Sequence, residues 1–346
     1  MRITSLIAGF LAAALLTTSW SAWAQESACD ENYTIEGGDS LSRIADRFYG
    51  DRDNWSLIFY SNRSAIGENP SLISVGTEIW IPCPGDELAD GELPEANTEN
   101  AEVELLTASD YRPFTDQSLP FGGMVTRIVA ESFASHDDAP TFKIDWIDDW
   151  SSHLSPLLER RMFDMGFPWL RPPCVDDPET KIADCPRKAF HFSDPIFEML
   201  IVNFVRQADN FDPATDKDLH GKRLCRPDGY FTFDLEDRGL ISGDTITLVQ
   251  PQTVAECFQL LVDEEVEVVT LNEFTGRDAI ENLDLHATVA VSDKLATVQG
   301  LYLIVHKLHP RATVFMHHFN RGLRKLREEG RLDEIVAEHL AEFYGA

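Results

Sequence analysis

The sequence predicts a mixed α/β protein in two parts, a small strand–helix–helix–strand module and a larger α/β domain. Over residues 102–346, apolar runs of strand length alternate with helix-period patterns. Between Cys29 and Cys83, a compact segment has the pattern of strand, helix, helix and strand. The residues between the two parts, 85–101, are acidic and lack apolar periodicity, so we expect an extended linker that lets the parts move independently.

The first 24 residues have the pattern of a secretory signal peptide. Met1 and Arg2 precede an apolar run from Leu6 to Leu16, and Ala22-Trp23-Ala24 offers a cleavage site. The apolar run is too short to span a bilayer, so we expect export with cleavage near Ala24. The alternative, a lipid anchor at Cys29, lacks a Leu three residues before the cysteine.

The formal net charge is −30, which argues against nucleic acid and anionic lipid surfaces as partners, since their phosphates would be repelled. The charge is explained by a solvated acidic surface, and a preference for cationic solutes is the alternative.

Six cysteines in an exported chain indicate disulfides, although the sequence alone leaves the pairing open. Nearest-neighbour pairing is expected, because each successive pair brackets one segment. The pairs would be Cys29 with Cys83, Cys174 with Cys185, and Cys225 with Cys257. No Cys-x-x-Cys occurs and the histidines are scattered, so neither a metal site nor a cofactor is predicted.

Within the module, a strand at Tyr33–Ile35 leads to a helix that Asp39 or Ser40 can cap and that Gly50 ends. A second helix (55–61) and a strand (78–82) follow. The segments "YTIEGGDSLSRIADRFYG", "NWSLIFYSN" and "NPSLISVGTEIWIP" make residues 29–84 resemble a LysM domain. The resemblance implies binding to the N-acetylglucosamine backbone of peptidoglycan, in a groove between two loops. The implied contacts are Gly38, Asp39, Ser40, Leu41, Asn69, Pro70, Ser71, Leu72 and Ile73.

The alternative for Gly38, Asp39 and Leu41 is that they only cap and pack the first helix.

Strands are predicted in the large domain at 103–107, 144–146, 163–167, 200–205, 266–271 and 301–305. Helices are predicted at 125–133, 150–161 and 253–262, and two more have apolar faces at 315–326 and 332–340. This order, with Phe192-Ser193-Asp194-Pro195, Asp164 and the terminal "LRKLREEGRLDEIVAEHL", resembles the type II periplasmic solute-binding proteins of extracellular family 3.

That resemblance implies a two-lobed solute-binding domain over 102–346. Lobe 1 would comprise 102–205 and 291–346, and lobe 2 would comprise 206–290. It also implies a periplasmic location and an ABC-type permease as membrane partner.

The ligand positions follow from the same resemblance. Tyr111, Phe114 and Trp150 would stack on a solute, Arg171 or Arg187 would pair with a carboxylate, and Glu273 would bind a cation. Gly229 would open a helix whose backbone N–H groups face an anionic group. The family's usual Asp falls on Ala108, and aromatic residues replace its hydroxyl residues at Trp169, Tyr230 and Phe231. A larger or less polar solute than a free amino acid is therefore expected.

The sequence thus predicts a peptidoglycan-associated periplasmic protein that captures a small amino-acid-like or larger polar solute between two lobes, for ABC-type transport. The alternative is a non-transporting cell-wall sensor or scaffold that binds a muropeptide or a partner protein. An enzyme is not expected, because neither Gly-x-Ser-x-Gly nor His-Glu-x-x-His occurs.

Overall fold

The structure is a computed structural model that describes residues 29–67, 70, 72–84, 101–109, 111–172, 185–228, 230–241 and 245–345. The predicted signal peptide and nearly all of the acidic segment lie outside the described residues. So do four of the predicted site and disulfide positions: Asn69, Ser71, Cys174 and Gly229.

The small module (residues 29–84) has the predicted strands and two helices, β1 (Glu31–Thr34), α1 (Leu41–Tyr49), α2 (Trp55–Ser61) and β2 (Glu78–Ile81), and one further short helix, α3 (Arg63–Ile66), that was not predicted. The strands pair antiparallel. Ser40 caps α1, because its Oγ accepts the Arg43 N–H, and Gly50 ends the helix in the left-handed region at φ 70°.

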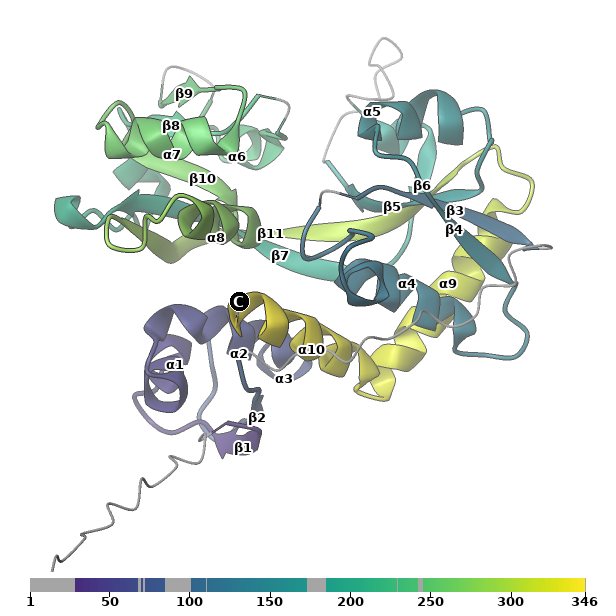
Figure 1. Ribbon diagram of the computed structural model, residues 1–346, viewed down its shortest axis with the longest axis horizontal. Coiled ribbons are helices and arrows are strands. Elements are labelled where there is room, and N and C mark those ends of the chain that lie inside the picture. Colours follow the sequence, from purple (N-terminus) through teal and green to yellow (C-terminus); the bar gives the residue numbers. More distant parts are fainter. Residues whose placement is uncertain are drawn as a thin grey trace, which may run out of the picture.

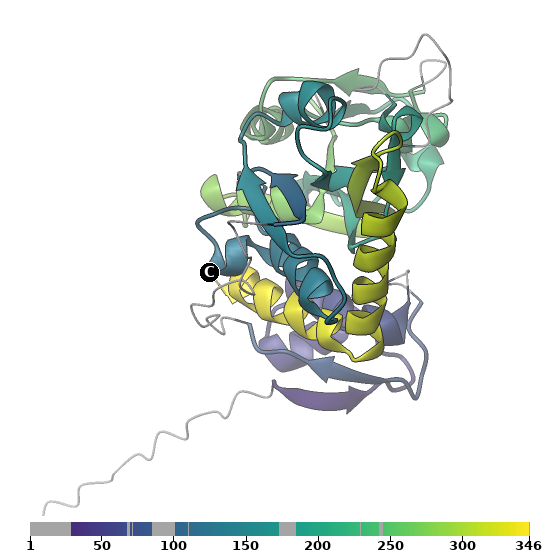
Figure 2. The same cartoon turned by 90° about the vertical axis from the view of Figure 1, so that its right-hand side faces the viewer.

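One lobe of the large domain carries a parallel sheet of β4 (Phe142–Trp146), β3 (Val103–Thr107) and β5 (Met165–Leu170), with β6 (Phe190–Phe192) paired to the long strand β11 (Val289–His306). The helices α4 (Met124–Ala134) and α9 (Ala312–Glu328) pack against each other beside this sheet, and α10 (Arg331–Gly345) follows α9 (Figures 1 and 2). The helix predicted over 150–161 is kinked in the middle and ends early, since a short π-helical segment, His153–Leu158, follows α5 (Trp150–Ser152). Within this segment, Ser155 is extended and Pro156 has no N–H, so the helix is interrupted.

The other lobe has the parallel strands β9 (Thr247–Val249), β8 (Arg223–Cys225) and β10 (Val268–Asn272). Its helices are α6 (Phe233–Asp237), α7 (Val254–Val262) and α8 (Glu273–Asn282). The capping box predicts where α7 begins, since Thr253 and Glu256 bond to each other's backbone N–H.

Two long strands connect the lobes. β7 (Phe197–Arg206) and β11 (Val289–His306) pair antiparallel between them, and their register shifts between Ser292 and Thr297 (Figure 1). The predicted lobe limits at 206 and 291 fall at the ends of these strands. The α/β, two-lobed fold class is therefore confirmed.

The expectation that the module moves independently is wrong, because the module is docked on the large domain. Its helix α2 packs against α10. The Ser56 and Tyr344 hydroxyls lie 2.6 Å apart, and Arg63 pairs with Glu198 of β7 at 2.5 Å. Independent movement was expected from the acidic composition of residues 85–101. That composition does not predict that α2 is buried against the large domain.

Two of the predicted disulfides are present. Cys29 pairs with Cys83 across the module, and Cys225 pairs with Cys257, which joins β8 to α7. Cys185 is also disulfide-bonded, and its expected partner Cys174 lies outside the described residues.

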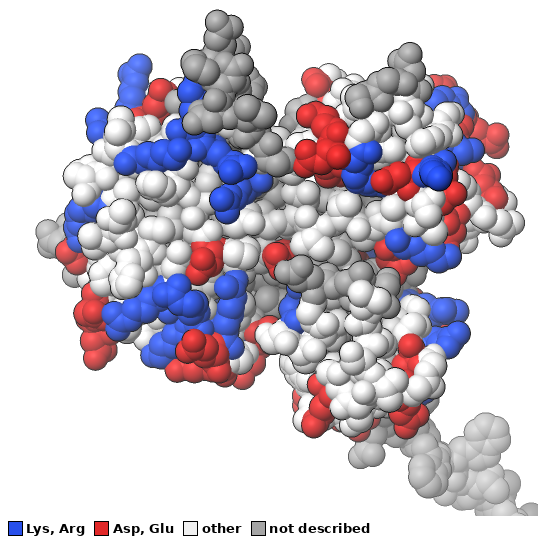
Figure 3. Space-filling view, turned by 180° about the vertical axis from the view of Figure 1, so that it is seen from behind, with Lys and Arg blue, Asp and Glu red and all other residues white. Residues whose placement is uncertain are grey.

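Acidic and basic side chains are interspersed on the face shown in Figure 3, without one dominant patch. In the described part of the chain, no helix combines the length and the apolarity needed to span a membrane. The same part has no group of three or more His, Cys, Asp or Glu side chains arranged to hold a metal ion.

Candidate functional site

A cavity of about 560 Å³ lies between the lobes, within the size range of small-molecule sites. We call it the interlobe cavity. It is lined from lobe 1 by Tyr111, Trp150, Leu154, Ser155, Pro168, Trp169 and Leu170, from the connecting strands by Met199, Ile201, Gln299 and Leu301, and from lobe 2 by Arg226, Tyr230, Phe231, Phe233, Asp234, Leu271 and Asn272. Both lobes and both connecting strands therefore contribute to one site.

Aromatic rings form the lobe 1 wall. The Trp150 ring meets the Trp169 ring edge to face at 5.8 Å and the Tyr111 ring at 6.3 Å. The Tyr111 hydroxyl lies 3.8 Å from the Met199 sulfur on β7. Burial raises the pKa of Tyr111, and the nearby Tyr230 of lobe 2 adds to the effect, so this phenol stays neutral.

His153 supports the same wall from behind. Its ring centroid is 5.0 Å from that of Trp150, and its Nε2 lies 2.6 Å from the Ile147 carbonyl oxygen. Burial lowers the pKa of His153, so the imidazole is held neutral against the tryptophan.

On the lobe 2 wall, Arg226 forms a buried ion pair with Asp234. Its Nε donates to the Thr270 carbonyl oxygen, Nη1 to the Phe231 carbonyl oxygen and to Asp234, and Nη2 to Asp234 and the Thr270 hydroxyl. All five guanidinium donors are used within the protein, so Arg226 orients the Phe231–Asp234 segment and does not offer a ligand contact.

The remaining polar lining groups are uncharged. Asn272 caps α8 through the Thr275 N–H at 2.9 Å, and the Ser155 hydroxyl donates to Glu159 at 2.7 Å. Gln299 projects from β11. Among the described lining residues, the only charged side chains are thus the mutually neutralised Arg226 and Asp234.

A second, polar cavity of about 300 Å³ shares Phe233 and Gln299 with the first. We call it the polar annex. It is lined also by Arg171, Glu198, Asp237, Val298, Gly300 and Tyr302. The Arg171 guanidinium lies 5.8 Å from the Phe192 ring centroid. Among the described residues it forms no ion pair, so within this part of the chain it is the cation that lines the annex.

The structure brings together only some of the predicted ligand positions. Tyr111 and Trp150 line the interlobe cavity and Arg171 lines the annex. Arg187 is exposed in the short turn Pro186–Lys188 and lines neither cavity.

Phe114 and Glu273 are fully buried elsewhere. Phe114 packs against Phe197 and Phe274. The carboxylate of Glu273 accepts the Arg277 Nε at 2.8 Å and the Tyr344 hydroxyl at 3.1 Å, while the preceding Asn272 reaches the cavity. Glu273 was expected at the end of a strand, but β10 ends at Asn272 and Glu273 begins α8, so it is Asn272 that faces the cavity.

Sequence reasoning missed Arg226 and Asp234. Their signal was available, because an Arg directly after the buried strand residue Cys225 needs a carboxylate partner, and Asp234 lies in the next helix.

Some of the predicted peptidoglycan-binding residues of the module are held inside the module, and others are exposed. Asp39 accepts the Tyr33 hydroxyl at 2.6 Å and the Glu36 N–H at 2.9 Å, Ser40 caps α1, and Leu41 is in the core. In the second loop, Leu72 is 70% exposed, and it is the most exposed large apolar side chain of the module.

The comparisons with known proteins give no family assignment. No family model matches the chain. An uncharacterized protein of Deinococcus radiodurans is 40% identical over 57 residues, 16% of this chain, so the match spans about a fifth (21%) of that relative's length.

Among solved structures, a mutant of ArgBP from T. maritima is 21% identical, with 69% of this chain and 95% of that chain covered and a TM-score of 0.48. The amino acid ABC transporter substrate-binding protein AbpA of Streptococcus pneumoniae, bound to L-arginine, is 15% identical, with 70% and 95% covered and a TM-score of 0.48. The periplasmic domain of BvgS from B. pertussis is 15% identical, with 68% and 42% covered and a TM-score of 0.49. All three TM-scores lie below 0.5, and no ligand is assigned to this chain from them.

Proposed function

We propose that the chain is an exported, peptidoglycan-associated solute-binding protein that holds its solute in the interlobe cavity. The observation that supports this function is a cavity of ligand size to which both lobes contribute aromatic side chains. A solute that touches both lobes stabilises one relative orientation of them, which is how a two-lobed binder responds to its ligand. The disulfides support export, since they persist in oxidising compartments.

The lining favours a particular kind of solute. A free amino acid brings a carboxylate and an ammonium group, and burying each without a partner is costly. Arg226 and Asp234 neutralise each other, so neither charge is open to such a ligand. We propose a solute with an uncharged, ring-bearing body in the interlobe cavity and an anionic end beside Arg171 in the polar annex.

Thermal unfolding of the mature chain with a compound panel tests this function. The panel comprises amino acids, oligopeptides, muropeptides and organic acids, with aromatic carboxylic acids among the last. A ligand at 100 times its Kd should stabilise the fold by about 2.7 kcal/mol. A shift from aromatic acids, lost on Arg171→Gln and kept on Arg187→Gln, is expected. Silence from every small compound would contradict solute capture, and a shift from muropeptides alone would favour the cell-wall sensor.

Association with peptidoglycan is the second part of the proposal, and exposed Leu72 supports it. The module would contact the N-acetylglucosamine backbone through the loop that carries this side chain. In sedimentation with purified peptidoglycan, Leu72→Ser should reduce the bound fraction. Leu308→Ser, which changes an equally exposed leucine at 73% on the large domain, should not. Equal loss in both variants would contradict the placement.

Transport through an ABC-type permease belongs to the same proposal. It would be tested by solute uptake in cells that lack the protein.

A further inference from the structure

The module's helix α2 occupies an unusual position, because all seven of its residues, Trp55–Ser61, are buried. A helix buried all round is part of a core rather than of a surface. One side of α2 faces the module, and the other faces α10 and the beginning of β7 (Figure 1).

Tyr60 on this helix contacts one connecting strand, β7, and the first helix turn of lobe 2 beside it. Its hydroxyl accepts the Leu200 backbone N–H of β7 at 2.8 Å. Its ring centroid lies 5.1 Å from that of Phe197, at the beginning of β7, and 5.2 Å from that of Phe274, in the first turn of α8 of lobe 2. Tyr60 is 0% exposed, so no solvent separates these contacts.

A chain of polar contacts runs alongside. The Ser56 hydroxyl of the module lies 2.6 Å from the Tyr344 hydroxyl of α10, which donates to Glu273 of α8 at 3.1 Å. Glu273 is itself 0% exposed and is paired with Arg277. Module, C-terminal helix and lobe 2 are therefore joined through groups that are costly to leave unpartnered.

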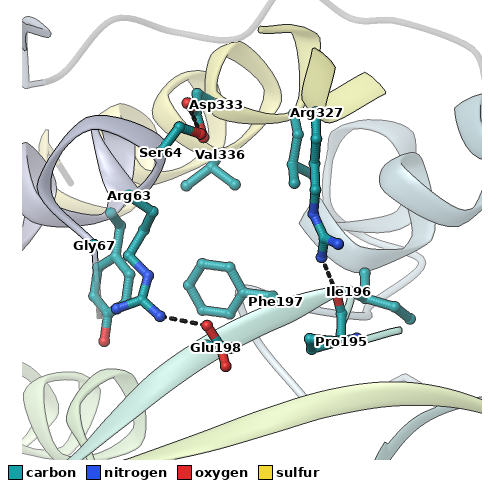
Figure 4. A pocket seen from close by; sticks show the side chains of 12 residues that line it. Arg63, Ser64, Gly67, Pro195, Ile196, Phe197, Glu198, Arg327, Asp333 and Val336 are labelled. Atoms are coloured by element: carbon teal, nitrogen blue, oxygen red, sulfur yellow. Dashed lines mark hydrogen bonds and ion pairs between the residues drawn. The ribbon is translucent and has the colours of Figure 1, made fainter. Parts of the chain in front are cut away.

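Arg63 contributes a further contact between the module and the large domain, on the side of the polar annex. Figure 4 shows it at one end of a cavity of about 240 Å³ between the module and the large domain, where it pairs with Glu198. Glu198 also lines the polar annex beside Arg171. The module thus holds, through Arg63, one of the two carboxylates that share the annex with Arg171, the other being Asp237. Nearby, Ser64 donates to Asp333 of α10 at 2.6 Å.

These contacts depend on the angle between the lobes. If lobe 2 rotated about β7 and β11, Phe274 would move relative to Phe197, and Tyr60, which packs against both rings, would lose contact with one of them. Close-packed interfaces have discrete arrangements and do not deform continuously, so the docked module fits one lobe orientation.

On the basis of the proposed function, we propose that the N-terminal module is a clamp on the lobe connection, in which Tyr60 and Arg63 are positioning residues for the interlobe cavity. By linkage, any ligand that changes the lobe angle changes the docking of the module, and the reverse holds with the same coupling free energy.

The test is the distance between the lobes in the full mature chain without any solute. Nitroxide labels at Met162→Cys (lobe 1, 57% exposed) and Leu283→Cys (lobe 2, 40% exposed) report this distance by double electron–electron resonance. The chain without further changes should give one narrow distribution. Tyr60→Phe removes only the hydroxyl that holds Leu200, and Arg63→Gln removes the guanidinium that pairs with Glu198 and stacks on Phe59. Each should broaden the distribution or add a second population. The double variant, Tyr60→Phe with Arg63→Gln, should change the distance distribution more than either single variant.

Matched controls lie in the module away from the connection. Tyr33→Phe removes a hydroxyl bonded to Asp39 inside the module, and Arg52→Gln changes an exposed arginine. Both should keep the original distribution. Distributions that stay superimposable in Tyr60→Phe and Arg63→Gln, even with a lower Tm, would overturn the clamp and make the contact merely structural.

The failures of the two proposals are distinguishable. An altered distribution supports the clamp even when the compound panel is silent. A compound that binds, together with unaltered distances, overturns the clamp and leaves the proposed function standing.

Discussion

Trp150 is the residue with the most ring contacts on the lobe 1 wall of the interlobe cavity, since it meets Tyr111, His153 and Trp169. We expect Trp150→Ala to weaken the best-binding compound of the panel tenfold or more, about 1.4 kcal/mol, as for an aromatic anchor. Titration calorimetry measures this. Met162→Ala, an exposed apolar change in the same lobe, serves as the control, and unchanged affinity in Trp150→Ala would refute the stacking role.

Asp234 is expected to matter for stability because its partner is buried with it. Asp234→Asn leaves the Arg226 charge without compensation, which costs about 3–5 kcal/mol for a buried pair. Urea denaturation should show this loss. Asp216→Asn breaks the more exposed pair with Arg238 and should cost less than about 1 kcal/mol. Similar losses in the two variants would contradict the structural role of the Arg226–Asp234 pair.

For single residues, the sequence predicts which residue types contribute to the site better than it predicts where each side chain points. Tyr111 and Trp150, which the family resemblance names as solute contacts, do line the interlobe cavity. Phe114 and Glu273 were assigned to the same site, but one-residue differences at a turn decide whether a side chain enters a cavity or the core. No pattern in the sequence predicts whether such a side chain points into the cavity or into the core.

The helices α4 and α9 pack so closely at Gly322 that one added methyl group tests the contact. A Cβ added at Gly322 on α9 would lie 1.8 Å from the Ser132 carbonyl oxygen on α4. We expect Gly322→Ala to destabilise the fold by about 1–3 kcal/mol or more. In an exposed helix the same change would stabilise by up to about 1 kcal/mol, so the sign is diagnostic.

Thermal unfolding measures this effect. Gly37→Ala is the control, because its Cβ would meet nothing within 4 Å. A stabilised Gly322→Ala variant would contradict the helix packing.

Strong periodicity made most elements predictable, as for β3, α4, α7 and the two C-terminal helices. The exceptions have local causes. The helix after Trp150 is interrupted at Ser155-Pro156, a signal that the apolar spacing of Leu154, Leu157 and Leu158 obscured. β11 is far longer than the predicted strand at 301–305, because its first half is only partly buried and lacks a continuous apolar run.

For the molecule as a whole, acid should reduce stability through His339 on α10. Burial, with Arg127 as the smaller cause, lowers the pKa of His339 to about 3. The unfolded chain binds this proton near its ordinary pKa of about 6.5, so stability present above that pH is lost as the pH falls toward 3. One such group contributes a slope of up to about 1.4 kcal/mol per pH unit.

Urea denaturation between pH 7 and about pH 4 tests this expectation. His339→Gln should show a shallower loss of unfolding free energy than the unsubstituted chain, and the exposed control His317→Gln should not. Parallel slopes in all three proteins would refute the assignment.

The docking of the module on the large domain was the least predictable feature of the whole molecule. The apolar residues of α2 were predicted as a helix, but a seven-residue helix with apolar residues all round does not state which surface covers its outer side. That surface comes from residues almost 300 positions later, since Ser56 and Tyr344 are 288 apart. Local pattern cannot report such a pairing.

This separation bears on how the chain is made. In synthesis, α2 is made long before α10. The side of α2 that packs on α10 therefore stays uncovered by it until residues 331–345 have been made. A chain cut before Arg331 would leave the Ser56 hydroxyl without its Tyr344 partner, even with the strands and the disulfide of the module in place. The burial of this early helix thus reports whether synthesis has reached α10.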